Sequence, residues 1–229
     1  MTHKEVQNIA RETMAYLRTV IRPEMSLREL RRLAEEKMLA LGADSFWYWD
    51  VGAFVFAGDE TAVSVSGREY VTTDRLIGED DIITVDLSPQ KEGIWGDYAR
   101  TIILENGAVI ENIAQIQHDE WRSGLQSEER LHRELLSFAS PQTTFEQLYQ
   151  HMNARIAALG FVNLDFLGNL GHSIVQNKDD RVYIEKGNQM PLSAVDYFTF
   201  EPHISVPQSK YGYKKENIYY FVDGRLTAL

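Results

Sequence analysis

Apolar residues recur at every third or fourth position in several segments of the chain, which is the spacing of an amphipathic helix. The first such segment covers residues 4–21, and Pro23 ends it because proline cannot continue a helix. Ser26 then begins a second helix, with Glu29 three residues later to complete a capping box. Gly42 marks the expected end of this helix, because glycine readily adopts the backbone conformation that follows a helix.

The same helical pattern returns in the middle of the chain. Residues 111–139 predict a long helical region with a break near Gly124, since glycine destabilises a helix interior. Thr144, with Gln147 three residues later, predicts the start of another helix that runs to about Leu159.

Short runs of aromatic and β-branched residues between and after these helices predict strands. These runs are Ser45–Trp49, Ala53–Phe56, Ala62–Val65, Ile82–Leu87, Ala99–Leu104, Tyr197–Phe200 and Ile218–Val222. The polar segment Ser88–Gly93 separates two of them, Ile82–Leu87 and Ala99–Leu104, which we expect to pair as a hairpin. Helices followed by strands occur twice along the chain, so the pattern predicts one α+β domain with two similar halves.

Composition narrows the function. The chain has 229 residues, 44% of them hydrophobic, which is enough for a sizeable core, and its formal net charge is -11. This acidic balance disfavours nucleic acid and anionic membranes as partners. There is no cysteine, no signal-peptide pattern at the N-terminus, and no apolar run near the roughly 20 residues of a membrane span. We therefore expect a cytoplasmic protein.

Two aspartates stand in segments that otherwise read as core strands. Asp86 lies inside the first strand of the predicted hairpin, and Asp97 comes just before the second. If the hairpin closes near Gln90–Glu92, the two carboxylates lie roughly opposite each other and repel. A divalent metal ion would offset that repulsion. The alternative, that both point to solvent at the strand ends, stays open at this point.

Three later residues extend the set of candidate metal ligands. His172 lies in NLGHSI, Glu201 in YFTFEPHI and Glu216 in YGYKKENIYYF. Taken singly, a histidine is more often a hydrogen-bonded core residue, and a glutamate at a strand edge is usually solvated. Four carboxylates and one imidazole together suit a pair of ions such as Mn, Co, Fe or Zn.

The order Asp, Asp, His, Glu, Glu on these segments resembles the M24 metallopeptidases, which include methionine aminopeptidases, Xaa-Pro aminopeptidases and prolidases. The matching pieces are VDLSPQKEGIWGDYART, GHSI, FTFEPHI and KKENIYYF. The resemblance implies the α+β pita-bread fold, with two pseudo-symmetric halves around a curved antiparallel sheet. It also implies that residues 1–229 form a single catalytic domain without an additional N-terminal domain, and that the protein is a homodimer.

The resemblance also implies roles for the five residues. Asp86 would bind one divalent metal ion, Asp97 and Glu216 would bridge both ions, and His172 and Glu201 would hold the second. Glu201 would in addition take the proton from the attacking water and pass it to the leaving nitrogen. The expected substrate is a small peptide or an Xaa-Pro-type amide.

Two outer histidines that are usual in this family have no counterpart in the sequence. The segment before the first aspartate reads SVSGREYVTTDRLI, and the segment after the metal-binding histidine reads GHSIVQNKDDR. His203, two residues after Glu201, is the candidate that replaces one of them, because strand alternation puts both on one face. Arg68 is a candidate for binding a substrate carboxylate. Tyr98 is a candidate for the wall of the substrate pocket.

These departures leave three hypotheses about function. The first is an M24-type hydrolase of small peptides. The second is an enzyme with the same fold and metals but a reaction other than peptide cleavage. The third is a non-catalytic binding module, which the full set of five ligand candidates disfavours.

Overall fold

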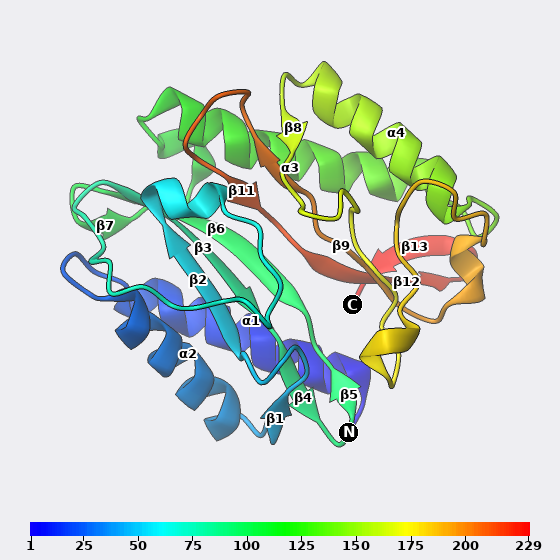
Figure 1. Cartoon of the computed structure of the whole chain (residues 1–229), viewed down its shortest axis with the longest axis horizontal. Helices are drawn as coiled ribbons and strands as arrows, with labels where there is room; N and C mark the ends of the chain where they lie inside the picture. The colour runs from blue at the N-terminus through cyan, green and yellow to red at the C-terminus, as the bar shows by residue number, and fades with distance from the viewer.

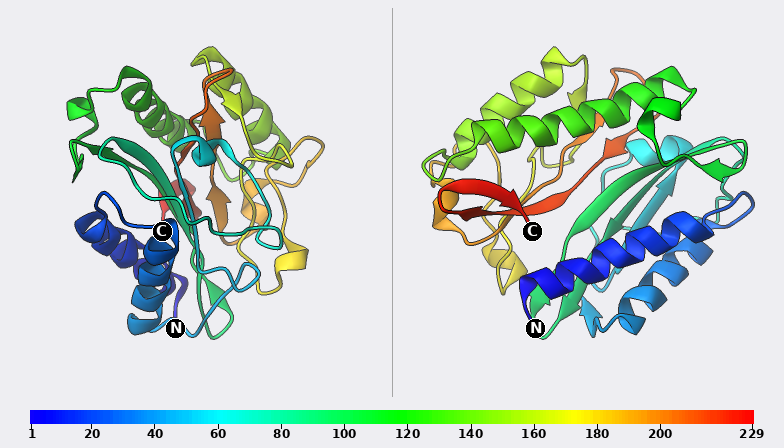
Figure 2. Two further views of the ribbon diagram at one scale, coloured as in Figure 1. Left: turned by 60° about the vertical axis from the view of Figure 1, so that its left-hand side comes forward. Right: turned by 180° about the vertical axis from the view of Figure 1, so that it is seen from behind.

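The computed structural model describes all residues 1–229. Two pairs of helices lie on opposite sides of a layer of strands, as Figures 1 and 2 show. The first pair is α1 (His3–Val20) and α2 (Leu27–Ala40), and the second is α3 (Asp119–Phe138) and α4 (Phe145–Ala158). No helix combines the length and the apolar character that a membrane crossing would need.

The strands form small antiparallel sheets between the helix pairs. The first half contains a four-stranded sheet with the order β2-β3-β6-β7, made of β2 (Ala53–Ala57), β3 (Asp81–Leu87), β6 (Tyr98–Glu105) and β7 (Ala108–Val109). A three-stranded sheet lies beside it, made of β1 (Ser45–Phe46), β4 (Pro89–Lys91) and β5 (Ile94–Trp95). The second half has the sheet β13-β12-β9, made of β9 (Phe198–Phe200), β12 (Asn217–Val222) and β13 (Arg225–Ala228). Its other sheet is β11-β10-β8, made of β8 (Val162–Asn163), β10 (His203–Ser205) and β11 (Tyr213–Lys214).

The second helix of each pair begins in the same way, which supports the prediction of two similar halves. Ser26 caps α2 by accepting a hydrogen bond from the amide of residue 29, and Thr144 caps α4 by accepting one from the amide of residue 147. Each capping residue also forms an isolated antiparallel bridge, Ser26 with Leu76 and Thr144 with Pro191. The predicted pair of helices is thus present twice, and in each pair the second helix begins with the same cap and the same isolated bridge.

Alternation along β3 determines where Asp86 points. Ile83, Val85 and Leu87 are fully buried in the core formed with α1 and α2. Ile82 belongs instead to the core of the second half, and successive strand residues face opposite sides. Asp86, an even number of residues after Ile82, therefore faces the second half of the molecule. The hairpin of β3 and β6 is confirmed, with Asp86 paired with Ala99.

Two of the predicted elements differ from the structure. Ala62–Val65 is not a strand: a 3-10 helix, Gly58–Ala62, precedes it and turns the chain away from the sheet edge, held by the Thr61 hydroxyl that donates to the Gly58 carbonyl. The break near Gly124 is also absent, since Gly124 lies within continuous α3. A Cβ at Gly124 would lie 2.3 Å from the ring of Tyr213, so glycine here makes room for packing.

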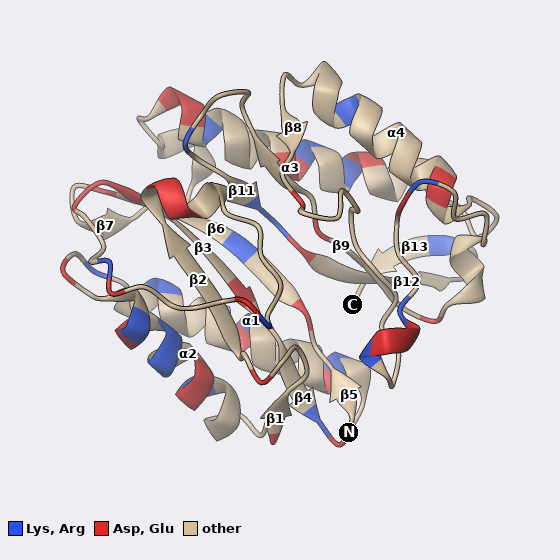
Figure 3. Ribbon diagram, viewed as in Figure 1, with Lys and Arg blue, Asp and Glu red and all other residues tan.

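The two halves meet where β6 runs beside residues 214–217. The Lys214 amide donates to the Thr101 hydroxyl at 2.8 Å, and the same hydroxyl donates to the Lys214 carbonyl at 3.1 Å. The Glu216 amide donates to the Ala99 carbonyl at 3.0 Å. Figure 3 shows charged residues on both segments at this seam, although charges elsewhere lie mainly on helices and loops.

His132 on α3 supports the same segment from behind. Its Nε2 atom lies 3.0 Å from the Lys215 carbonyl, which can only accept, so Nε2 carries the proton and Nδ1 accepts from the Tyr219 hydroxyl at 2.7 Å. Both nitrogens are therefore satisfied by a neutral ring. Burial, aided by the charge of Lys215, lowers the pKa of His132 well below its usual value.

The contribution of His132 to stability should accordingly depend on pH. The unfolded chain takes up a proton at His132 below about pH 6.5 while the folded protein does not, so stability is lost as the pH falls. We expect the stability advantage of the wild type over His132→Gln to shrink by up to about 2 kcal/mol between pH 7 and pH 5, because each pH unit below about 6.5 contributes at most about 1.4 kcal/mol. Urea unfolding of both proteins at the two pH values measures this, and an advantage that does not change with pH would contradict it.

Candidate metal centre

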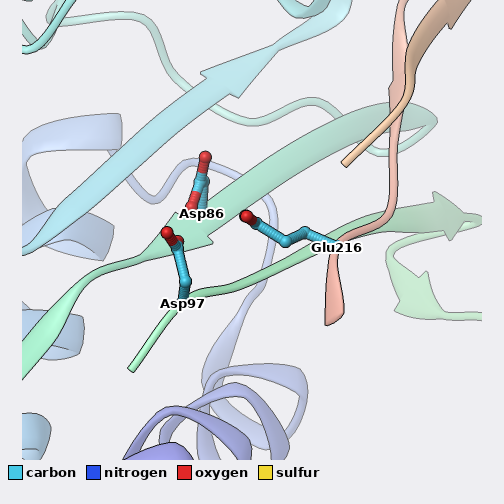
Figure 4. Close-up of side chains that lie close together, drawn as sticks. All are labelled: Asp86, Asp97 and Glu216. Atoms are coloured by element: carbon cyan, nitrogen blue, oxygen red, sulfur yellow. The ribbon is translucent and has the colours of Figure 1, made fainter. Parts of the chain in front are cut away.

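Three carboxylates from separate elements meet at the seam between the halves. Asp86 lies near the end of β3, Asp97 directly before β6, and Glu216 between β11 and β12. One oxygen of each lies within 4.8 Å of the other two, and Figure 4 shows all three side chains pointing toward one another. Asp97 and Glu216 are buried, so this is not an exposed acidic patch.

His172 and Glu201 complete the cluster. The Nε2 atom of His172 lies 3.6 Å from Asp97 Oδ2 and 3.7 Å from Glu201 Oε1. The Nδ1 atom lies 3.0 Å from the Ser173 carbonyl and must be the donor in that bond. The lone pair of Nε2 is therefore free and directed at the carboxylates, which is the tautomer that a metal-binding histidine needs.

The backbone around Gly171 fixes His172 in this position. The His172 amide donates to the Thr199 hydroxyl at 3.0 Å, and the Thr199 amide donates to the His172 carbonyl at 2.7 Å. Gly171 has a φ of +139°, and a Cβ on it would lie 2.3 Å from the Thr199 carbonyl oxygen. Only glycine allows this close approach between the histidine segment and β9.

Burial and mutual repulsion shift the pKa values of two carboxylates in the cluster. Burial, with the charges of Asp86 and Glu201, raises the pKa of Asp97 well above its usual value. Burial and the neighbouring carboxylates, Asp97 first among them, likewise raise the pKa of Glu216. Both Glu216 oxygens are buried without any hydrogen-bond partner. Because buried polar atoms are normally satisfied, this donor set fits divalent cations.

One basic side chain already contacts the cluster. Lys214 Nζ lies 2.5 Å from Asp86 Oδ2 and 3.2 Å from Glu201 Oε2. Burial alone would lower the pKa of Lys214, but the surrounding carboxylates outweigh it, and this pKa lies well above its usual value. For Glu201, burial acts to raise the pKa, but the charge of Lys214 outweighs that effect and the pKa is lowered.

A cavity of about 140 Å³ opens above the cluster. Asp86, Asp97, His172 and Glu201 line its floor, and apolar side chains form much of its wall; these include Trp47, Phe54, Phe56, Val63, Val65, Phe166 and Leu167. Arg181, Lys214 and His203 are the basic and imidazole side chains that reach it. The site thus combines a charged floor with apolar walls, as small-molecule sites commonly do.

Comparison with known proteins agrees with this geometry. Residues 2–223 match the sequence profile of metallopeptidase family M24. The chain belongs to this family. The resemblance carried by the order Asp, Asp, His, Glu, Glu is thereby confirmed.

Similar proteins support the M24 assignment and the fold. A methionine aminopeptidase from Helicobacter pylori is 28% identical over 192 residues, which cover 80% of this chain and 69% of that protein. A prolidase from Thermococcus sibiricus superposes with a TM-score of 0.81 at 20% identity, over 99% of this chain and 57% of that one. An X-Pro aminopeptidase from Thermotoga maritima gives 0.77 at 20% identity, over 98% and 58%. The predicted α+β pita-bread fold is confirmed, and this M24 chain spans less than two thirds of the length of these solved structures.

The remaining candidates of the sequence lie in different places. His203 lines the cavity, and its Nε2 atom donates to the Thr61 carbonyl at 2.7 Å. The guanidinium of Arg68 lies 4.4 Å from the ring centre of Trp49, and Arg68 is not among the residues that line the cavity. Tyr98 packs against the core of the first half, with Arg100 3.7 Å above its ring, and also lies outside the cavity lining.

Sequence reasoning missed two residues of the candidate site, Lys214 and Arg181. Lys214 precedes Glu216 by two positions in KKENI, so strand alternation offered a signal for it. Arg181 lies in an irregular segment where no periodicity could have indicated its direction. Its Nε donates to the Lys178 carbonyl at 2.7 Å, and its guanidinium carbon lies 5.3 Å from the ring centres of Trp47, Tyr48 and Tyr183.

Proposed function

We propose that this chain is a dinuclear metal-dependent hydrolase that removes the N-terminal residue from small peptides or cleaves an Xaa-Pro-type bond. The proposed ligands are Asp86, Asp97, His172, Glu201 and Glu216. The observation that carries the proposal is the buried Glu216 carboxylate, whose two oxygens have no partner in the protein and lie against other carboxylates. Similar proteins named methionine aminopeptidase and prolidase support this choice of reaction.

The chain's own residues would move the proton in this reaction. Divalent ions in such a site polarise the scissile carbonyl and lower the pKa of water. Glu201, whose pKa is lowered, is ionised at neutral pH and accepts the proton of the attacking water. It then donates this proton to the leaving nitrogen as the carbon–nitrogen bond breaks, so water is divided between the two products.

His203 takes the role of a hydrogen-bond acceptor toward the substrate in this proposal. Because Nε2 donates to the Thr61 carbonyl, Nδ1 carries a lone pair. Burial lowers the pKa of His203 to about 4, so the ring stays neutral at neutral pH and Nδ1 can accept a hydrogen bond from a substrate N–H. This histidine comes from a different element than the outer histidines usual in the family.

Arg181 favours substrates that end in a carboxylate close to the scissile bond. It lines the cavity, is held by three aromatic rings, and forms no ion pair within the protein. A guanidinium of this kind suits a carboxylate. The cavity of about 140 Å³ is smaller than typical drug-sized sites of roughly 300–1,000 Å³, which also favours dipeptides.

Replacing Arg181 by Met should therefore raise the KM for a dipeptide while leaving the KM for its C-terminal amide nearly unchanged. A charge-assisted hydrogen bond contributes about 1.5–3 kcal/mol, so we expect an increase of roughly 10- to 150-fold. Initial-rate kinetics on the two substrates measure this. Arg68→Met is the matched comparison, because Arg68 is the arginine that the sequence proposed for the same task. An effect of Arg68→Met alone would reverse the assignment.

Finer features of the function remain proposals of the same kind. We propose that the ions are Mn, Co, Zn or Fe, in line with a mixed carboxylate and imidazole ligand set. We also propose that residues 1–229 act as one catalytic unit, that the protein is cytoplasmic and that it forms a homodimer.

Metal analysis and a substrate panel test the proposed function together. Protein purified without chelator should contain about two transition-metal ions per chain, and unblocked dipeptides, including Xaa-Pro dipeptides, should be hydrolysed when Mn(II) is added. Protein that holds the metal but leaves the whole panel intact would favour a different reaction, which the missing outer histidines would explain. Protein that binds no metal would contradict the proposal in every form.

A further inference from the structure

The backbone of Lys214 is fixed by its neighbours. Its backbone is held on both sides by Thr101, whose hydroxyl bonds to the amide and to the carbonyl of Lys214. The residue also pairs with His203 between β11 and β10. The side chain therefore starts from a fixed point beside the carboxylates, and only 21% of it is exposed.

The ammonium group contacts one ligand from each side of the cluster. It forms an ion pair with Oδ2 of Asp86, one of the three clustered carboxylates. It forms another with Oε2 of Glu201, the neighbour of His172. Each of these carboxylates keeps one oxygen for a metal ion, and Glu201 Oε1 faces His172. Lys214 thus shares two ligands with the proposed ions rather than pairing with an unrelated acid.

The charge of Lys214 changes what the cluster can accept. When all four carboxylates are ionised, as bound divalent ions would require, they carry four negative charges beside a neutral imidazole, and Lys214 cancels one of them. A first divalent ion leaves the cluster with one negative charge, whereas a second makes it positive. Repulsion between like charges is strong in a partly buried site, so the ammonium opposes the binding of each divalent ion, and the first ion further opposes the second.

We propose that Lys214 acts as a built-in cation of the metal centre and weakens the binding of both divalent ions. This inference rests on the dinuclear centre of the proposed function. It makes the chain tolerate a metal-free or singly loaded centre, because the ammonium stabilises two of the carboxylates while an ion is absent. It also makes occupancy of the centre depend on metal concentration.

Calorimetric titration of the metal-free protein with MnCl2 tests this inference without any activity measurement. Lys214→Gln removes the charge but keeps a group that can donate hydrogen bonds to both carboxylates, whereas Lys214→Arg keeps the charge. We expect the Kd of each Mn(II) ion to fall at least tenfold in Lys214→Gln and to stay near the wild-type value in Lys214→Arg. Lys210→Met is the control, because Lys210 is exposed and its removal changes the net charge equally.

Thermal unfolding supplies a second measurement. Metal-free Lys214→Gln should unfold at a lower temperature than the metal-free wild type, and saturating Mn(II) should remove the difference. Unchanged or weaker Mn(II) binding in Lys214→Gln would overturn the inference and leave the proposed function intact. A wild type that binds no Mn(II) would overturn the proposed function and this inference with it.

Discussion

Asp97→Asn is expected to remove metal-dependent activity, with a loss in kcat/KM of more than about 100-fold. Loss of a group that merely orients a ligand typically costs 10- to 100-fold, and the proposed role of Asp97 is to bind both ions directly. An amide of the same shape cannot supply the negative charge that two cations need. Metal content after dialysis and initial rates on a dipeptide with added Mn(II) measure the effect.

The same substitution should not weaken the metal-free protein. Burial raises the pKa of Asp97, so the folded state holds this proton at pH values where the unfolded chain has lost it. The folded state then binds more protons, and its stability falls as the pH rises above about 4. Asn avoids this penalty, and the Tm of metal-free Asp97→Asn at pH 8 should equal or exceed that of the wild type.

Asp223→Asn is the matched control for Asp97→Asn. Asp223 is exposed and lies in a turn with a φ of +49°, a conformation that asparagine also adopts readily. It should keep the activity, the metal content and the Tm of the wild type. Full activity of Asp97→Asn would show that Asp97 is not a ligand, whereas a low Tm without metal would assign it a structural role.

Gly171→Ala should reduce kcat/KM by about 100-fold, because a misplacement of about 1 Å in a catalytic group can have an effect of this size. The added Cβ would lie 2.3 Å from the Thr199 carbonyl oxygen and 2.9 Å from its carbon, so the backbone must move. Any such movement displaces His172, whose amide and carbonyl both bond to Thr199. Rates at saturating Mn(II), together with the Mn(II) affinity, measure the change.

Gly187→Ala separates backbone strain from displacement of the histidine. Gly187 has a φ of +88°, and a Cβ there would meet no atom within 4 Å. It should cost about 1–2 kcal/mol of stability, as a left-handed conformation does for other residues, and leave kcat/KM unchanged. Equal kinetics for the two variants would show that the contact of Gly171 with Thr199 does not position His172.

Much of the fold could be predicted because local signals and packing agree. The capping residues Ser26 and Thr144 were visible as sequence motifs and begin α2 and α4 in the structure. The hairpin of β3 and β6 followed from two apolar runs around a polar turn. Acidic residues inside apolar strand segments also indicated the candidate site, since a buried carboxylate is tolerated only with a positively charged or hydrogen-bonding partner.

The errors have a physical cause that no local pattern contains. Gly124 reads as a helix breaker, but the ring of Tyr213, 89 positions later, occupies the space that a side chain would need. Arg181 reads as a loop residue, and its direction is set by three aromatic rings, two of which, Trp47 and Tyr48, lie in a distant segment. Both outcomes depend on tertiary contacts between residues far apart in sequence.

The seam between the halves has a consequence for the molecule as a whole. Asp86 and Asp97 belong to the first half, whereas His172, Glu201 and Glu216 belong to the second. Two bound metal ions would therefore hold the two halves together, and neither half could form the metal centre by itself. Metal binding and the packing of the two halves against each other are linked, so a change that separates the halves also weakens metal binding.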